Sequence, residues 1–372
     1  MSEQVTPAHR RLLLPGFLSQ EQCEELEFIH KSNSTVGYHP GVFCTSLTNL
    51  ITSDCAHYIV PFILIREQFK EKVEEFFHCE FELFIEFTGM ISWTTGSSIG
   101  WHSDDNRPYL KQRNFSAVCY LNTYDKNFKG GLFHFADGEP STVTPNAGDA
   151  LIYTSDETST HSVDEILGGE RLTLTLWFTK DNTHDEDAKL LSHLKNSLHP
   201  TLPIPETMYW VSDKHDSSEL GFDLRYARLH VLGIDAYRSK ESWFLVCNDE
   251  LFETPFSSIL HLSQALHFYK WKGKGVKEDC ERSKINNVLK VKQSQKEQIS
   301  GIKNVLLKDR ELLGQVFGDM SLSCIDQNNP SFDWMEFSSA LVEFEEYSCK
   351  LREILAKCLP LWESNAILFH VE

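Results

Sequence analysis

The sequence predicts an α+β protein built around an antiparallel β-sandwich or jelly roll. Residues 81–180 consist of short runs rich in β-branched and aromatic residues, with turn-forming residues between them. Little helical pattern separates these runs, which disfavours a parallel sheet with crossover helices. Two helical patterns precede the runs, and longer helical patterns follow them.

Two helices are expected before the strands. The first covers about residues 20–31, because Ser19-Gln20-Glu21-Gln22 can form a capping box at its start and the apolar residues that follow share one face. The second covers residues 62–78, where Phe62, Phe69 and Val73 recur at helical spacing.

Six strands are expected in the region that follows the helices. Turn-forming sequences, such as Asp125–Gly131 and Pro145–Asp149, separate several of them. The expected strands are 84–94, 115–121, 131–136, 141–144, 149–154 and 171–179.

The pattern changes again further along the chain. An acidic, polar stretch and several prolines mark residues 183–207 as a linker or domain edge. We therefore expect a first domain over 1–182, with its β core at about 81–180, and a mostly helical C-terminal region over 208–372. The role of that region stays open between a degenerate second barrel, a substrate-binding helical cap and a dimer surface. Its expected helices are 257–270, 284–318 and 333–358, and its strand-like runs are 230–234 and 242–247.

The charge and the cysteines narrow the class of protein. A formal net charge of −19 over 372 residues disfavours a nucleic-acid partner, whose phosphates would need clustered Lys and Arg. No stretch approaches the ~18–20 apolar residues of a membrane helix, so no membrane partner is expected. The ten cysteines are scattered without a Cys-x-x-Cys pair, which is typical of reduced thiols. Leu12–Leu14 is too short for a signal peptide and His370–Glu372 is no retention signal, so we expect a cytoplasmic or nuclear location.

Residues 100–105, Gly-Trp-His-Ser-Asp-Asp, follow the expected strand 84–94. Burial of such groups without partners costs several kcal/mol each, about 2–7 for a neutral polar group and more for a charge. Either this segment turns out into solvent, or a cation such as a metal ion binds to His102 and Asp104. Other His-x-Asp/Glu sequences follow a helix, lie in the linker or end the chain, whereas this one lies between two expected strands.

His161 is the candidate for a third ligand. It lies between the expected strands 149–154 and 171–179, so its side chain can project into the same cavity as His102 and Asp104. Two imidazoles and one carboxylate hold one face of an iron(II) octahedron and leave its other positions open. The same set permits zinc but does not favour it, because zinc usually keeps four ligands with one open position. Taken alone, His161 is also interpretable as a partly buried histidine with protein partners.

Arg171 indicates whether the site also binds an anion. It lies ten residues after His161, at the head of an apolar strand in which Leu172, Leu174 and Leu176 alternate with more polar residues. A guanidinium that faces the interior needs an anion, and its planar fork matches the geometry of a carboxylate. A bound dicarboxylate is therefore the candidate partner, and the alternative is an outward-facing Arg at a sheet edge.

The order of these motifs resembles the Fe(II)- and 2-oxoglutarate-dependent oxygenase family, and within it the prolyl hydroxylase type. The resemblance covers residues 84–181, about a quarter of the chain. The lead-in Asn114–Ser116 and the close Thr175–Asp181 most resemble the catalytic domain of the leprecan-type prolyl 3-hydroxylases. In chain order the matching residues are His102-Ser103-Asp104, Ser116–Asn122, Gly130–Phe135, Ala147–Asp149, His161 and Arg171.

This resemblance implies a dioxygenase whose core is a double-stranded β-helix (jelly roll). The implied reaction hydroxylates peptidyl proline and converts 2-oxoglutarate and O2 to succinate and CO2, with L-ascorbate as a further requirement. It implies that His102, Asp104 and His161 are both the Fe(II) ligands and the catalytic residues. Arg171 would pair with the distal carboxylate of 2-oxoglutarate.

Two more residues are carried by the resemblance. Tyr120 matches a family tyrosine that can hydrogen-bond the cosubstrate, and Thr173, on the same face as Arg171, is a weaker candidate. Collagen 4-hydroxylases usually have Lys at the position of Arg171, so the chain departs from that branch. The aromatic residue that often precedes His-x-Asp is only loosely matched by Trp93 or Trp101, and neither is included in the site.

Several alternatives stay open. An oxygenase of the same fold could act on another protein side chain or a small molecule, since substrate choice lies in loops such as 105–114 and 122–130. A non-enzymatic scaffold is disfavoured, because an idle set of ligands would leave buried polar groups unpaired. A nucleic-acid demethylase is disfavoured, because that branch has a second Arg where this chain has Trp177. Collagen-modifying relatives work in the endoplasmic reticulum, which is the alternative location, and the sequence fixes neither 3- versus 4-hydroxylation nor the oligomeric state.

Overall fold

The computed structural model describes six stretches of the chain, and each of its two compact units is described by itself. The first unit consists of Met1–Glu27, Cys44–Ile204 and Leu351–Glu372, and the second of Phe28–Phe43 and Pro205–Lys350. The described residues within these units are 10–39, 41–197, 206–212, 221–225, 259–272 and 334–364.

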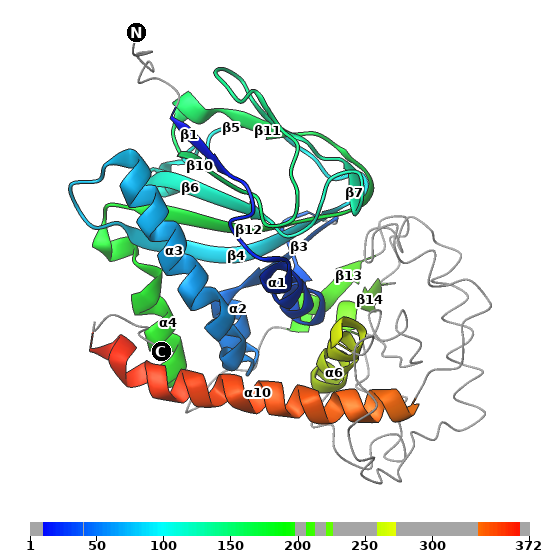
Figure 1. The fold of residues 1–372 in the computed structure, drawn as a ribbon. Helices are drawn as coiled ribbons and strands as arrows, with labels where there is room; N and C mark the ends of the chain where they lie inside the picture. Colours follow the sequence, from blue (N-terminus) through cyan, green and yellow to red (C-terminus); the bar gives the residue numbers. More distant parts are fainter. Residues whose placement is uncertain are drawn as a thin grey trace. The chain divides into compact units, whose positions relative to one another are not determined.

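A large antiparallel sheet forms the base of the first unit (Figure 1). Its strands lie in the order β1-β10-β6-β12-β4-β3, so neighbours in space are far apart in sequence. The strands are β1 (Arg11–Leu14), β10 (Ala150–Thr154), β6 (Arg113–Tyr120), β12 (Ile166–Thr179), β4 (Phe84–Thr94) and β3 (Val42–Ser46).

A smaller antiparallel sheet faces the large one. Its strands, in order, are β5 (Ile99–His102), β11 (His161–Val163), β8 (Phe133–Phe135) and β9 (Thr142–Val143), while β7 (Phe128–Gly130) pairs with the start of β12. One hydrophobic cluster takes side chains from both sheets, so the two sheets enclose a common interior. The residues of this cluster are Val118, Tyr120, Leu151 and Tyr153 from the large sheet and Phe133, Phe135, Val143 and Val163 from the small one. The predicted jelly roll is confirmed.

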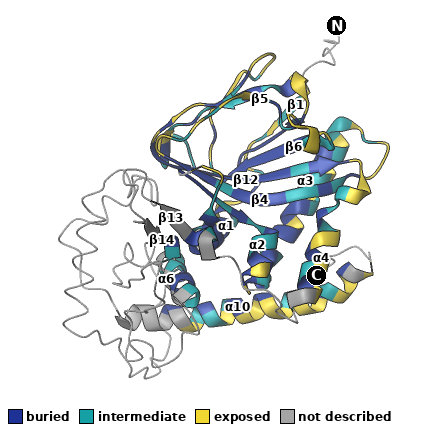
Figure 2. Cartoon of the chain, turned by 180° about the vertical axis from the view of Figure 1, so that it is seen from behind, coloured by how far each residue is buried: buried dark blue, intermediate teal, exposed yellow. Residues whose placement is uncertain are grey.

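Both faces of β12 are covered, which explains its composition. Leu172, Leu174 and Leu176 are fully buried on the outer face of the sheet, and Arg171 and Thr173 alternate with them toward the interior. Figure 2 shows the central strands of the large sheet as buried along most of their length. The outer face thus supplies the apolar core, and the inner face is free to carry polar side chains.

Helices of the first unit lie against that outer face. α3 (Val60–Phe77) buries Phe62 and Phe69, and its Arg66 reaches Thr88 on β4. The shorter helices α2 (Leu47–Thr52) and α4 (Glu186–Ser197) belong to the same unit. The 3-10 turns of this unit are η1 (Ala56–Ile59), η2 (Pro108–Leu110), η3 (Glu157–Ser159) and η4 (Asn182–His184).

A buried ionic cluster joins α3, β4 and α4. Arg66 is 1% exposed, and its Nη2 lies 3.1 Å from Glu186 Oε2 and 2.7 Å from Asp187 Oδ1. Its Nε donates to Thr88 Oγ1 at 2.9 Å, and the Thr88 N–H donates to Glu186 Oε1 at 3.0 Å. The Nε1 of Trp362, near the end of α10, donates to Asp187 Oδ2 at 3.0 Å. Each charged group therefore has the partners that burial requires.

The second unit is described by its helices and a small hairpin. Phe28 stacks on Trp271 with ring centroids 5.2 Å apart, and Gln264 Nε2 donates to Asn33 Oδ1 at 2.7 Å. The described elements are β2 (Thr35–Val36), η5 (Glu206–Tyr209), β13 (Trp210–Ser212), β14 (Gly221–Asp223), α6 (Ile259–Lys272) and α10 (Trp334–Glu363), the last of which continues beyond this unit.

Most sequence-based expectations for the elements agree with the structure. The helices expected at 20–31 and 62–78 are α1 (Gln20–Asn33) and α3, and Ser19 and Gln22 form the expected reciprocal cap. All six expected strands are present, although β12 begins earlier than expected. The helices expected at 257–270 and 333–358 are α6 and α10. The helix at 284–318 and the strand-like runs at 230–234 and 242–247 lie outside the described residues.

Other features were not expected or stay predictions. The short strands β1, β2, β3, β5, β7, β11, β13 and β14 were not predicted from the sequence. The helices α2 and α4 were not predicted either, and α4 occupies part of the expected linker 183–207. The domain boundaries themselves stay a prediction. Among the described helices, none is long and apolar enough to span a lipid bilayer. No cysteine of the described stretches forms a disulfide.

The Arg66 cluster yields a stability prediction. Arg66→Met leaves the buried Glu186 carboxylate without its counter-ion, so the free energy of unfolding should fall by about 3–5 kcal/mol. Urea unfolding of the full chain measures this change. Lys72→Met is the control, because the Lys72–Glu75 pair is exposed, and we expect no measurable change there. Equal unfolding midpoints for the two variants would show that the buried cluster does not stabilise the unit.

Candidate metal centre

The pairing of β5 with β11 places two histidines side by side. His102 is the last residue of β5 and His161 the first of β11, and the two are directly opposite each other in the antiparallel ladder. Their ring centroids are 4.3 Å apart. Asp104 lies two residues beyond the end of β5, in the segment that leads to β6. Residues far apart in sequence thus meet at one end of the small sheet.

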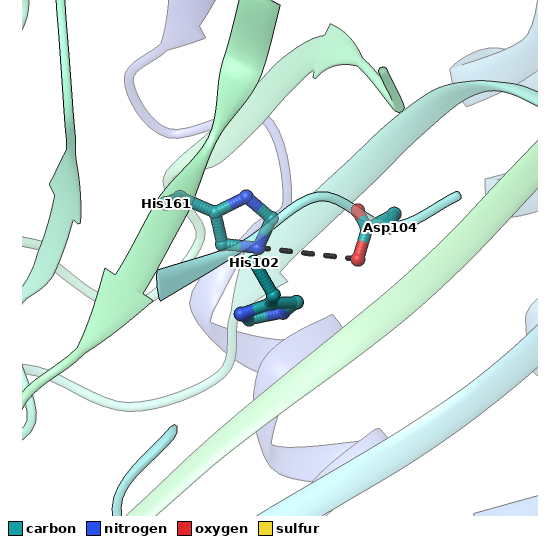
Figure 3. A group of neighbouring side chains, drawn as sticks. All are labelled: His102, Asp104 and His161. Atoms are coloured by element: carbon teal, nitrogen blue, oxygen red, sulfur yellow. Dashed lines mark ion pairs between the residues drawn. The ribbon is translucent and has the colours of Figure 1, made fainter. Parts of the chain in front are cut away.

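The three side chains converge on one point (Figure 3). One ligand atom from each of His102, Asp104 and His161 lies within 4.8 Å of the other two. His161 Nε2 and Asp104 Oδ1 are 3.9 Å apart, which is too long for a hydrogen bond. His161 is 3% exposed, so this gap is shielded from solvent on one side.

Backbone carbonyls orient both imidazoles. His102 Nδ1 lies 2.8 Å from Gly100 O, and His161 Nδ1 lies 2.9 Å from Ser159 O. A carbonyl oxygen only accepts, so each Nδ1 carries the hydrogen and each Nε2 keeps its lone pair for a ligand. Burial lowers the pKa of His161, although the Asp104 carboxylate opposes this effect. The neutral imidazole that metal binding requires is therefore favoured.

The two carboxylate oxygens of Asp104 have different contacts. Oδ2 accepts from Ser116 Oγ at 2.5 Å and from Tyr153 OH at 3.0 Å. Oδ1 faces His161 Nε2 and, among the described residues, accepts no hydrogen bond. Burial, with the Asp104 carboxylate as the second cause, holds the pKa of the Tyr153 phenol well above its usual range. Tyr153 therefore remains a donor.

Asp105 fixes the turn that carries Asp104 through its own hydrogen bonds. The Asp105 backbone N–H donates to Ser155 O at 3.1 Å. Its carboxylate accepts from Ser103 Oγ and from Lys111 Nζ, both at 2.8 Å. Asp105 thus stabilises the turn, and Asp104 alone of the two aspartates points toward the histidines.

Arg171 is buried in the interior without an acidic partner among the described residues. It is 3% exposed, and its Nη2 lies 3.5 Å from Tyr120 OH. Its Nε is buried and has no hydrogen-bond partner. A buried guanidinium with an unsatisfied donor is costly unless an anion binds to it. A ligand carboxylate can supply the partner that the Arg171 guanidinium lacks.

The glycine at position 131 leaves room for the side chain of Arg171. Gly131 has a φ of +63°, and a Cβ at this residue would lie 2.2 Å from Ile166 Cδ1 and 3.3 Å from Arg171 Cδ. A larger residue would clash with the side chain of Ile166 and crowd the stem of Arg171. The Gly-Gly sequence at 130–131 is thus required by the close approach of β12 as well as by backbone conformation.

Tyr120 and Thr173 lie beside Arg171 but differ in whether their hydroxyl hydrogens are already donated to the protein. They are paired across β6 and β12, so both face the interior. Burial raises the pKa of Tyr120, which Arg171 only partly opposes, so the phenol stays neutral and can donate to a ligand. Thr173 Oγ1 lies 3.4 Å from the Ile91 carbonyl and already donates to it. Tyr120 is therefore the better placed of the two predicted cosubstrate contacts.

Ser116 and Tyr153 were not predicted as site residues from the sequence. Tyr153 lies in an otherwise apolar strand, and a buried tyrosine usually needs a partner for its hydroxyl, which was the available signal. Ser116 gave no such signal, because only the register of β6 shows which way it faces. The two tryptophans left out of the site lie in different settings: Trp93 is buried opposite Arg171 on β4, and Trp101 is 59% exposed.

The donor set fits a particular class of metal. Two imidazole nitrogens and one carboxylate oxygen on one side of an ion are typical of non-haem iron(II), which keeps other positions open. Zinc would more often take a further protein ligand or a single water. The unpaired Arg171 donor adds a group that can bind a carboxylate in the same interior.

Comparison with known proteins places these residues within a described family. Residues 88–179 match the model of the 2OG-Fe(II) oxygenase superfamily. Prolyl 3-hydroxylase 1 of Rattus norvegicus is 24% identical over 230 residues, which cover 50% of this chain and 31% of that protein. The rat 2-oxoglutarate and iron-dependent oxygenase domain-containing protein 3 is 30% identical over 93 residues, covering 25% of this chain and 30% of that protein.

Among solved structures, a Pseudomonas putida prolyl-4-hydroxylase is 20% identical, with a TM-score of 0.38, and covers 47% of this chain and 94% of that one. The chain spans about a third of the length of the curated relatives it matches. The matched stretch contains the two histidines, Asp104 and Arg171. Residues 88–179 of this chain therefore form a domain of the 2OG-Fe(II) oxygenase superfamily, the family that its motifs resemble.

Proposed function

We propose that the chain is an Fe(II)- and 2-oxoglutarate-dependent dioxygenase that hydroxylates proline residues of a protein or peptide. One observation carries this proposal: three metal-ligand side chains converge in the same interior that buries Arg171 without an acidic partner among the described residues. A structural metal site would not need the second feature, and a structural arginine would have a carboxylate beside it.

His102, Asp104 and His161 would hold the iron through the two Nε2 atoms and Oδ1. When bound, iron(II) with 2-oxoglutarate and O2 supplies the oxidation that yields succinate, CO2 and a hydroxylated substrate. The chain itself needs no acid or base for this reaction. Its contribution is to orient the ligands and to keep the site dry, as the apolar interior around Phe133 and Leu151 does.

Arg171 would bind the distal carboxylate of 2-oxoglutarate through its fork, including the Nε that now lacks a partner. Tyr120 lies within reach of the same carboxylate, since its hydroxyl is already 3.5 Å from Arg171 Nη2. Thr173, on the same face, borders this position. Because Arg171 and the iron ligands face one interior, a single dicarboxylate cosubstrate can connect them.

The substrate proposal rests on the relatives and not on a substrate pocket in this structure. The match to prolyl 3-hydroxylase 1 supports peptidyl proline as the substrate, with hydroxylation at C3. The requirement for L-ascorbate stays a prediction. The match to the oxygenase domain-containing protein 3, whose name specifies no substrate, supports a second candidate: another protein side chain or a small molecule. The cytoplasmic or nuclear location stays a prediction.

Substrate class is tested with a peptide library. The purified full chain, supplied with Fe(II), 2-oxoglutarate and ascorbate, should add one oxygen to proline-containing peptides. Mass spectrometry, with the position on the ring assigned by comparison with 3- and 4-hydroxyproline standards, measures this. Oxygen addition only to residues other than proline would support the second candidate and reject the first.

His161→Ala should abolish metal-dependent succinate formation, because it removes one of the three metal ligands and leaves only two. Metal content after reconstitution and succinate detected by NMR measure the effect. His134→Ala is the matched control, since His134 lies on the neighbouring strand β8 and bonds Thr142 and Asp164 instead of the metal ligands. Equal activity in the two variants would contradict the assignment of His161.

Arg171→Ala should weaken 2-oxoglutarate binding about 30- to several-thousand-fold, the equivalent of roughly 2–5 kcal/mol for an unpaired buried carboxylate. Arg171→Lys should recover part of the loss, because it restores the charge without the fork. The 2-oxoglutarate concentration for half-maximal succinate formation measures this. Arg352→Ala, an exposed arginine on α10, serves as control. An unchanged 2-oxoglutarate requirement in Arg171→Ala would exclude this residue from the cosubstrate site.

A further inference from the structure

Two buried hydroxyls meet at a single oxygen of Asp104. Ser116 Oγ lies 2.5 Å and Tyr153 OH 3.0 Å from Oδ2, and neither hydroxyl group contacts Oδ1. Ser116 is 0% and Tyr153 2% exposed, so water does not compete for these bonds. The same carboxylate group therefore has one oxygen with two donors and one oxygen with none.

The direction of these bonds follows from hydrogen counts. An ionised carboxylate only accepts, so both hydroxyls donate to Oδ2. The Ser116 hydroxyl has a single hydrogen, which it donates to Asp104 Oδ2. Ser155 Oγ, 2.8 Å from Ser116 Oγ, must then be the donor of that pair. Ser155 therefore donates to Ser116, and Ser116 donates to Asp104.

The two hydroxyls belong to the large sheet, whereas both histidine ligands belong to the small one. Ser116 on β6 and Tyr153 on β10 are direct partners in the ladder, so their side chains leave the same face side by side. Tyr153 also contacts the ring of His161, with centroids 5.2 Å apart. The large sheet thus touches the aspartate and one of the histidines.

Asp104 needs such support more than the histidines do. His102 and His161 lie in paired strands, and each ring is fixed by a bond from Nδ1 to a backbone carbonyl. Asp104 lies in the segment after β5, outside any strand, and its carboxylate would otherwise turn freely. Outer hydrogen bonds to metal ligands commonly fix this orientation.

We infer that Ser116 and Tyr153 are positioning residues that hold Oδ2 away from the metal and direct Oδ1 toward the two imidazoles. This inference rests on the proposed function, because it assumes that these three residues bind a metal. It assigns the large sheet a role in the metal centre through groups that do not bind the ion themselves.

The test measures Mn(II) affinity of the full chain, without cosubstrate, by EPR of the free ion. Ser116→Ala and Tyr153→Phe should each raise the Kd for Mn(II) about 10- to 100-fold, and the double variant should raise it further. Ser155→Ala leaves the Ser116 donor in place, so its effect should be smaller than that of Ser116→Ala. Tyr124→Phe is the matched control, because Tyr124 contacts Phe128 and lies outside the group of hydroxyls at Asp104.

Thermal unfolding of the metal-free variants separates positioning from general stability. A variant that unfolds at lower temperature yet binds Mn(II) as the wild type does would overturn the inference, and so would a double variant with wild-type affinity. If the wild type itself fails to bind Mn(II), or if His161→Ala binds equally well, the proposed metal centre fails together with this inference. Weaker binding at near-unchanged unfolding temperature, with Tyr124→Phe unaffected, supports it.

Discussion

The pairing register of β5 and β11 determines whether the candidate ligand side chains can meet. Because His102 and His161 stand directly opposite each other, their side chains leave the same face of the small sheet. A slip of one residue in this register would turn one imidazole outward, since side chains alternate along a strand. The register changes between His161 and Val163, so the irregularity follows the ligand position and leaves the opposed pair intact. Asp104 then needs only a short turn to reach the same point.

The interior of the jelly roll combines an apolar lining with a few polar groups that have defined partners. Ser116 and Tyr153 satisfy one oxygen of Asp104, while backbone carbonyls satisfy the outer nitrogens of the histidines. Arg171 differs, because its Nε has no partner in the described chain. Protein interiors rarely leave such groups unsatisfied. We therefore propose that this interior binds a cation at His102, Asp104 and His161 and an anion at the Arg171 guanidinium.

The parts of this arrangement that depend on local sequence pattern could be predicted from the sequence. The β-branched and aromatic runs predicted the strands at 84–94 and 171–179, and the alternation with Leu172 favoured an inward-facing Arg171. The three candidate ligands were predicted because polar residues next to buried strands are costly and because their order resembles a known family. β5 and β11 escaped prediction, because they are short and contain the polar ligands themselves. The role of Ser116 depends on which strand lies beside β6, and no local pattern contains that information.

We propose that one metal ion and one carboxylate bind in this interior at the predicted residues. A crystal of the full chain grown with Mn(II) and 2-oxoglutarate under anaerobic conditions tests it through the anomalous signal of the metal. We predict one anomalous peak bounded by the Nε2 atoms of His102 and His161 and by Oδ1 of Asp104, with a carboxylate of 2-oxoglutarate on Arg171. A peak at any other position, or a 2-oxoglutarate molecule bound away from Arg171, would contradict it.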